Sequence, residues 1–231
     1  AFTGPATFIT GATGSNIVLD NASNAFSNSV EMLADAGAEA FGNIKFVDSA
    51  EIDFATSASS NGDLYINSST DGKVGGNLSV KATTGTITDT VAVAVSGTTT
   101  HVTSVDGGTT ALIIAASTID GDLTLTSGNS SGITDDGTVT VGGNFSATTA
   151  ASNGVINMGT MAVDGTVALN TNGNGAATIG NDAGLNFAAS TVRGALSATA
   201  TTGNISDDGA LAITGTTTLV TSANDATITL N

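Results

Sequence analysis

The 231-residue chain has no cysteine and no tryptophan, a single proline, and aromatic residues at only 4% of its positions. The absence of cysteine excludes a disulfide framework and a thiolate metal site, so the sequence indicates no particular redox compartment. So few aromatic residues cannot fill one large core, whereas a thin core repeated many times needs few of them. A hydrophobic fraction of 40% with only 10% charged residues also excludes a disordered chain, which would be polar and highly charged.

Positive charge is scarce as well. Four lysine and arginine residues stand against 20 aspartate and glutamate residues, for a formal net charge of −16. Such a chain repels phosphate backbones and anionic lipid surfaces, so we expect no nucleic-acid partner. The longest apolar run, Ala111–Ala116, is far too short to span a bilayer, and we expect no membrane insertion.

Catalytic signatures are missing too. The sequence has no nucleophile elbow, no phosphate-binding glycine loop and no zinc-type histidine cluster. β-Helical enzymes that act on acidic polysaccharides place carboxylates beside a basic residue. Here the single histidine, His101, stands where a related copy of its segment has Leu219. We therefore predict that the protein is not an enzyme.

What the chain does contain is repetition. Residues 74–104 recur at 192–222 at a constant offset of 118, with 19 identities in 31 aligned positions and no gap. A shorter pattern is an apolar residue, any residue, glycine, any residue and then alternating side chains; it begins at residues 74, 95, 119, 141, 163, 192 and 213. Alternation of period two is typical of β-strands. Only Glu31–Ala40 has a helix-forming composition, and Gly37 interrupts it.

The spacing of the short pattern, 21 to 24 residues with one interval of 29, predicts the coil of a right-handed parallel β-helix. Asparagine-glycine and aspartate-glycine pairs then mark the corners between strands. We expect a single all-β, repetitive solenoid domain over residues 1–231; the alternative is a row of tandem β-sandwiches. The phenylalanines expected to pack as wide core rungs are Phe8, Phe41, Phe46, Phe54, Phe145 and Phe187.

The two ends of the sequence also match each other. Residues 1–20 align without gaps to residues 212–231 at an offset of 211, with eight identical positions. Open, compatible solenoid ends would let copies stack head to tail in a non-closing assembly. Alternatively, the match reflects where a fragment lies in a longer array. The residues predicted to form the self-assembly ends are Ala1, Phe2, Phe8, Ile17, Leu19, Ile213, Leu219, Ile228 and Leu230.

Four blocks carry a family resemblance: NIVLDNASNAFSNSV at 16–30, STIDGDLTL at 117–125, STVRGALSATATTGNISDDGALAITGTTTL at 190–219 and ANDATITLN at 223–231. They resemble the β-strand repeats of very large bacterial surface proteins, the filamentous-haemagglutinin-like giant adhesins. The resemblance implies a secreted, β-rich rod without catalysis, located at the bacterial cell surface or outside the cell. Such arrays serve as stalks, adhesive fibres and filament shafts alike.

Two further patterns are typical of binding sites. Asp135, Asp136, Asp207 and Asp208 form two carboxylate pairs in related copies, each followed by glycine, and calcium is bound by such carboxylates with backbone carbonyls. Solvated turns are the alternative, and calcium is the only cofactor considered. Thr-x-Thr triplets at residues 86, 124, 138 and 227 have the form of an ice-binding face, but their spacing is too irregular for successive coils of one face.

The sequence therefore predicts a structural extracellular protein, a subunit of a filament or fibre assembled by head-to-tail stacking. The main alternative is a stalk segment of a giant adhesin, with a role in adhesion or biofilms. A calcium-binding surface-layer protein and an ice-binding protein are the remaining ones. The predicted partner is a second copy of the chain, and a surface polysaccharide is a further candidate.

Overall fold

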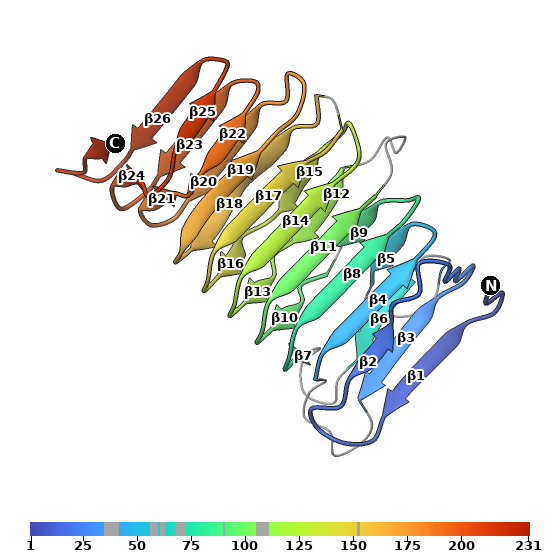
Figure 1. The fold of residues 1–231 in the computed structure, drawn as a ribbon. Helices are drawn as coiled ribbons and strands as arrows, with labels where there is room; N and C mark the ends of the chain where they lie inside the picture. Colours follow the sequence, from blue (N-terminus) through green and yellow to red (C-terminus); the bar gives the residue numbers. More distant parts are fainter. Residues whose placement is uncertain are drawn as a thin grey trace.

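The computed structural model describes residues 1–34, 42–55, 60, 63–67, 73–89, 91–104, 111–151 and 153–231. Within these residues there is no helix, and parallel strands about 22 residues apart stack into a β-solenoid of about nine turns. The two chain termini lie at opposite ends of the stack (Figure 1). The predicted parallel β-solenoid is confirmed, and tandem sandwiches are excluded, since every strand pair in the described residues is parallel.

The strands form two sheets that enclose the core (Figure 1). The large sheet contains 15 strands: β1 (Ala6–Thr10), β3 (Val30–Ala34), β6 (Asp63–Asn67), β5 (Ile52–Phe54), β9 (Ile87–Asp89), β12 (Leu112–Ala115), β15 (Ile133–Asp136), β18 (Ile156–Val163), β16 (Val139–Val141), β13 (Thr118–Ile119), β10 (Ala94–Val95), β7 (Lys73–Val74), β20 (Ala177–Asn181), β23 (Leu196–Ala200) and β26 (Thr217–Thr221). The small sheet contains 12 strands: β2 (Ile17–Leu19), β4 (Ile44–Asp48), β8 (Leu78–Ala82), β11 (Thr99–Thr103), β14 (Leu123–Ser127), β17 (Phe145–Thr149), β19 (Thr166–Asn170), β21 (Leu185–Phe187), β24 (Ile205–Asp207), β27 (Ile228–Thr229), β22 (Ser190–Val192) and β25 (Leu211–Ile213).

Of the stretch with helix-forming composition, residues 31–34 belong to strand β3 and residues 35–40 lie outside the described part of the chain. In the described part, no helix has the length and hydropathy needed to cross a membrane.

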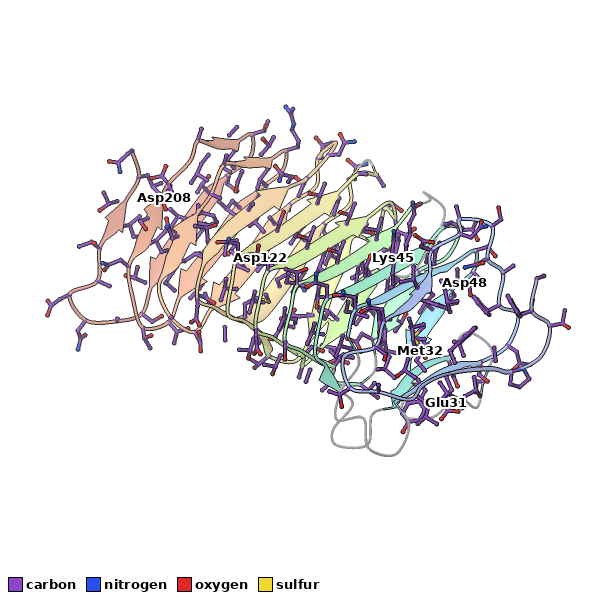
Figure 2. All side chains as sticks on the ribbon, turned by 60° about the horizontal axis from the view of Figure 1, so that its bottom comes forward. Glu31, Met32, Lys45, Asp48, Asp122 and Asp208 are labelled. Atoms are coloured by element: carbon purple, nitrogen blue, oxygen red, sulfur yellow. The ribbon has the colours of Figure 1, made fainter. Side chains whose placement is uncertain are left out.

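The core is a set of ladders along the axis of the rod. Successive side chains of a strand point to opposite faces, so every second residue points inward and stacks on its counterpart in the next coil. One ladder of the small sheet contains Phe46, Val80, His101, Leu125, Ala147 and Leu169, all buried. The predicted core phenylalanines Phe46, Phe54, Phe145 and Phe187 are buried, Phe8 is half-buried, and Phe41 lies outside the described residues. Figure 2 shows side chains on both surfaces of the coils.

The two copies of the long repeat lie on different sheets. In residues 74–104 the five-residue strands β8 and β11 belong to the small sheet. In residues 192–222 the corresponding strands, β23 and β26, belong to the large sheet. The coil has therefore shifted by part of a turn between the copies, and this shift accounts for the single 29-residue interval in the repeated pattern.

The shift takes place over strands β18 to β22. Strand β18 has eight residues and pairs with both short strands β15 and β16 on one side, and with the single strand β20 on the other. In the small sheet the opposite change occurs, because the single strand β19 pairs with both β21 and β22. Long and short strands thus exchange sheets, and the register of β18 against β20 shifts between Met158 and Met161.

A buried amide completes this junction. Asn181 is 1% exposed, and its side chain binds both backbone groups of Val163: Oδ1 accepts the Val163 N–H (2.8 Å) and Nδ2 donates to the Val163 carbonyl (3.0 Å). The same Nδ2 donates to the Gly184 carbonyl (2.7 Å). Buried backbone groups need hydrogen-bond partners. At the junction the Asn181 side chain provides the hydrogen bonds that a neighbouring strand provides elsewhere in the rod.

The first five glycines of the repeated pattern form a column along the rod, and the last two, Gly194 and Gly215, continue from Gly175 in a second column. Gly97 N–H donates to the Gly76 carbonyl (3.0 Å), and the same bond joins Gly121 to Gly97, Gly143 to Gly121 and Gly165 to Gly143. Beside this column, the side chain of Asn77 accepts from the backbone N–H of Thr98 in the next coil (2.9 Å). Backbones approach so closely here that there is no room for a side chain at the glycine positions.

Candidate functional site

The N-terminal end of the rod leaves strands β1 and β2 with one paired edge each among the described strands, to β3 and β4. The Phe2 ring stacks on Phe26, with ring centroids 4.8 Å apart, yet Phe2 is 50% exposed. Of the other residues predicted for this end, Ile17 is buried, Phe8 and Leu19 are half-buried, and Ala1 is exposed. They lie together at this end of the solenoid.

The C-terminal end is more open. Strand β26 pairs only with β23, and β27 only with β24, among the described strands. Ile228 stacks on Ile205 and is 46% exposed, whereas Ile205, one coil further in, is 0% exposed. Leu230 is also exposed, while Ile213 and Leu219 are half-buried. Apolar side chains that would be core in an inner coil are therefore uncovered here.

The two end coils have the same backbone conformation. The long strand begins at Ala6 in one and at Thr217 in the other, and 11 residues later the small-sheet strand begins, at Ile17 and Ile228. The turn between the two strands contains a residue with positive φ at equivalent positions, 79° in the first coil (Gly14) and 62° in the last (Asp225). The sequence match between the ends is thus a match in structure, and both ends place their long strand in the large sheet.

The predicted calcium residues are not brought together. Asp135 and Asp136 lie on β15 in the large sheet, whereas Asp207 ends β24 in the small sheet and Asp208 follows it. Figure 2 shows Asp208 near the C-terminal end of the rod. Within the described residues, no group of three or more histidine, cysteine or acidic side chains could hold a metal ion. Calcium binding by either pair remains a prediction.

The Asp135 carboxylate accepts hydrogen bonds from the neighbouring strand β18. Its oxygens accept the backbone N–H groups of Gly159 (3.2 Å) and Thr160 (2.7 Å), and the Thr160 hydroxyl (2.6 Å). These two residues form the bulge of β18, where the register against β20 shifts between Met158 and Met161. The carboxylate therefore holds the bulge in place.

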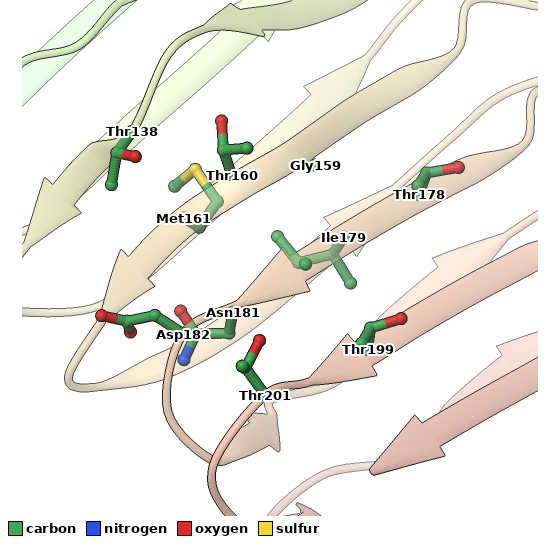
Figure 3. A pocket seen from close by; sticks show the side chains of 11 residues that line it. Thr138, Gly159, Thr160, Met161, Thr178, Ile179, Asn181, Asp182, Thr199 and Thr201 are labelled. Atoms are coloured by element: carbon green, nitrogen blue, oxygen red, sulfur yellow. The ribbon is translucent and has the colours of Figure 1, made fainter. Parts of the chain in front are cut away.

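A shallow hollow of about 390 Å³ lies on the outer surface beside this bulge (Figure 3). Threonines 138, 160, 178, 199 and 201 line it with Asp182, and Gly159 and Gly180 leave it open. The Thr-x-Thr triplets of the sequence are divided between the sheets, since residues 86–88 and 138–140 lie along the large sheet and residues 124–126 and 227–229 along the small one. As expected from their spacing, they do not form one face.

Strand β11, in the middle of the rod, presents polar side chains to the core. Thr99, His101 and Thr103 point inward from β11, whereas the rung below them presents Leu78, Val80 and Ala82. His101 is 1% exposed, its ring stacks on Phe54 (centroids 5.4 Å apart), and among the described residues neither ring nitrogen has a hydrogen-bond partner.

A second buried ionisable group, Asp89, lines the same small cavity as His101. Its carboxylate accepts the Val91 N–H (3.3 Å) and the Ser117 hydroxyl (3.4 Å). Burial, with a smaller contribution from the nearby Asp53 carboxylate, raises the pKa of Asp89 to about 7 despite these bonds. Burial lowers the pKa of His101 to about 4. The ordinary pKa order of the two groups is therefore reversed in the core.

We expect His101→Leu to stabilise the protein by about 1–2 kcal/mol, because it removes two buried nitrogens without partners and restores the aliphatic ladder between Val80 and Leu125. Urea unfolding at pH 7 followed by circular dichroism measures the change. The reverse substitution one coil further, Leu125→His, should lower stability. A less stable His101→Leu protein would show that the histidine has a partner in solution.

The pH dependence should separate the two groups. His101 binds a proton below pH 6.5 when unfolded but only below about 4 when folded, so its contribution to stability rises with pH between these values. Asp89 loses its proton near 3.8 when unfolded but near 7 when folded, so its contribution falls with pH over that window.

In the wild type these opposing slopes offset each other from about pH 4 to 6.5. The advantage of His101→Leu over wild type should therefore be greatest near pH 4, and that of Asp89→Asn near pH 7, each changing by on the order of 3 kcal/mol across its window. Unfolding curves at pH 4, 5.5 and 7 provide the measurement. Parallel profiles for all three proteins would contradict the assignment.

Comparison with known proteins finds one family model that matches part of the chain. Residues 174–231 match a family described as repeats of unknown function (DUF5649). No curated protein and no solved structure matches the chain. The matched segment contains strands β20 to β27, so it begins within the sheet exchange, and its five-residue strands β20, β23 and β26 belong to the large sheet.

Sequence reasoning missed Asn181 and Asp89, because nothing in their local sequence marks them as buried. A signal was present for His101, which interrupts an otherwise aliphatic position of the repeat. The glycine column was visible as a motif, but its cause, the close approach of successive backbones, depends on stacking.

Proposed function

We propose that the chain is a structural element of an extracellular filament, in which copies join end to end through their terminal coils. The observation that supports this best is that both end coils share one conformation, lie at opposite ends of the rod and leave strand edges and apolar side chains uncovered. Solenoid proteins normally protect such ends, because open parallel edges add further strands. The contact is heterologous, so it extends without closing.

The proposed interface is nearly free of charge. Residues 1–20 and 212–231 contain two carboxylates, Asp20 and Asp225, in a chain with a net charge of −16. In the end-to-end alignment Asp20 faces Asn231 and Asp225 faces Gly14, so like charges are not opposed. A chain that repels its own copies along most of its surface thus meets them most favourably at its ends.

Light scattering after size exclusion, with electron microscopy of the same fractions, tests the proposal. We expect mass to grow with concentration and thin fibres to form. Ile228→Glu places a charge on the uncovered C-terminal surface and should abolish growth. The matched control, Val155→Glu, adds the same charge at a 40% exposed position in the middle of the rod and should not.

The alternative is a stalk segment of a giant adhesin, which has the same rod but no self-association. The match of residues 174–231 to a repeat family is the observation that favours it. Wild-type protein that stays monomeric at the highest attainable concentration would overturn the filament proposal and favour the stalk.

A further inference from the structure

Nothing within a single copy of the chain explains why residue 4 is a glycine. Its φ is not positive, and a Cβ added there would meet no atom of the described residues within 4 Å. It aligns with Gly215, and with Gly194 in the coil before, where an added Cβ would lie 2.6 and 2.7 Å, respectively, from the glycine carbonyl oxygen of the preceding coil. At those positions glycine is required because a coil lies directly beneath.

From this we infer that Gly4 is the first member of a glycine column that continues from Gly215 of another copy. In the chain, Gly194 N–H donates to the Gly175 carbonyl (2.8 Å) and Gly215 N–H to the Gly194 carbonyl (3.0 Å). In the joint, Gly4 N–H donates in the same way to Gly215 of the next molecule. This inference rests on the proposed end-to-end assembly and specifies its register.

The register follows for both sheets at once. Placing Gly4 on Gly215 pairs Ala6 with Thr217 in the large sheet, as Thr217 itself pairs with Leu196. Because both end coils have 11 residues between their strands, Ile17 then meets Ile228 in the small sheet without distortion. The joint covers the apolar side chains that the C-terminal coil leaves exposed.

Pro5 is compatible with this register. Its counterpart, residue 216, uses only its carbonyl toward the neighbouring coil, which accepts the Leu196 N–H (2.9 Å). A proline, which lacks an N–H, can supply the same carbonyl to Thr217 of the other copy. The only proline of the chain therefore lies at a position where the joint needs an acceptor.

Cysteine pairs test the register, since the chain has no cysteine of its own. Thr7 and Thr218 are exposed, point outward and become direct neighbours in the joint, with Cα atoms about 4.8 Å apart, within disulfide range. In one molecule they lie at opposite ends of the rod. The double variant Thr7→Cys/Thr218→Cys should therefore form a ladder of covalent oligomers on a non-reducing gel.

Two further pairs sharpen this test. Val18→Cys/Thr229→Cys probes the small sheet and should form the same ladder. Thr7→Cys/Val220→Cys is displaced by two residues, which separates the Cα atoms by roughly 8 Å, and should cross-link roughly tenfold more slowly or worse. A faster ladder from the displaced pair, or no ladder in a sample that light scattering shows to be assembled, would overturn this register and leave the filament proposal intact. Absence of assembly would instead defeat the filament proposal itself.

Gly4→Ala gives an independent readout. It should leave the unfolding curve of the monomer unchanged, because its Cβ meets nothing in the chain, but should weaken assembly at least roughly tenfold through contact with Gly215 of the next copy. Gly159→Ala, where an added Cβ also meets nothing within 4 Å but the residue lies in mid-rod, should assemble normally. Equal assembly of both variants would contradict the inferred column.

Discussion

Replacing Asn181 with alanine is expected to lower the free energy of unfolding by about 3–4 kcal/mol. The loss leaves the N–H and carbonyl of Val163 and the carbonyl of Gly184 without the partner that the buried amide provides. Each buried backbone group left without a bond costs about 1–3 kcal/mol. Urea unfolding measured by circular dichroism gives the difference.

Two variants show whether hydrogen bonding is the cause. Asn181→Leu keeps the volume but not the bonds, and should be about as unstable as the alanine variant. The exposed Asn174 is a matched control, and its replacement by alanine should change stability by less than about 0.5 kcal/mol. Wild-type stability of Asn181→Leu would mean that the junction needs a filled space rather than an amide.

Gly97→Ala is expected to destabilise the protein by about 2–3 kcal/mol. The added Cβ would lie 2.6 Å from the Gly76 carbonyl oxygen and collide with the Asn77 side chain, which accepts from Thr98. Both neighbours are held by bonds between coils, so neither can move without breaking a rung. Thermal and urea unfolding both report the change.

The control for Gly97→Ala is Gly159→Ala, where the added methyl group has free space. Since alanine restricts the unfolded chain more than glycine does, this substitution should be neutral or mildly stabilising. Similar losses at both positions would show that backbone flexibility, and not the close approach of coils, accounts for glycine at residue 97.

Much of the fold follows from local patterns. Alternating side chains around residues 78–82 and 196–200 predict strands with one buried face, and the interval between glycine motifs predicts the coil. The end match indicated that the first and last coils are alike, and the structure adds that Gly14 and Asp225 give both end coils the same turn. The candidate calcium residues show the limit of this reasoning, because copies related in sequence lie on different sheets.

Local sequence patterns were enough to predict a stacked, parallel β-rod with two matching ends, because period-two alternation and the spacing of glycine motifs depend on residues close together in the chain. The sheet that each copy of the repeat joins is set instead by the stacking of the coils. Which sheet a copy joins depends on the summed lengths of all preceding coils and on the buried amide of Asn181 at the exchange. The meeting of Asp89 and His101 in one cavity was likewise decided by stacking, since neighbours across a solenoid core come from segments whose separation in sequence has no local signal.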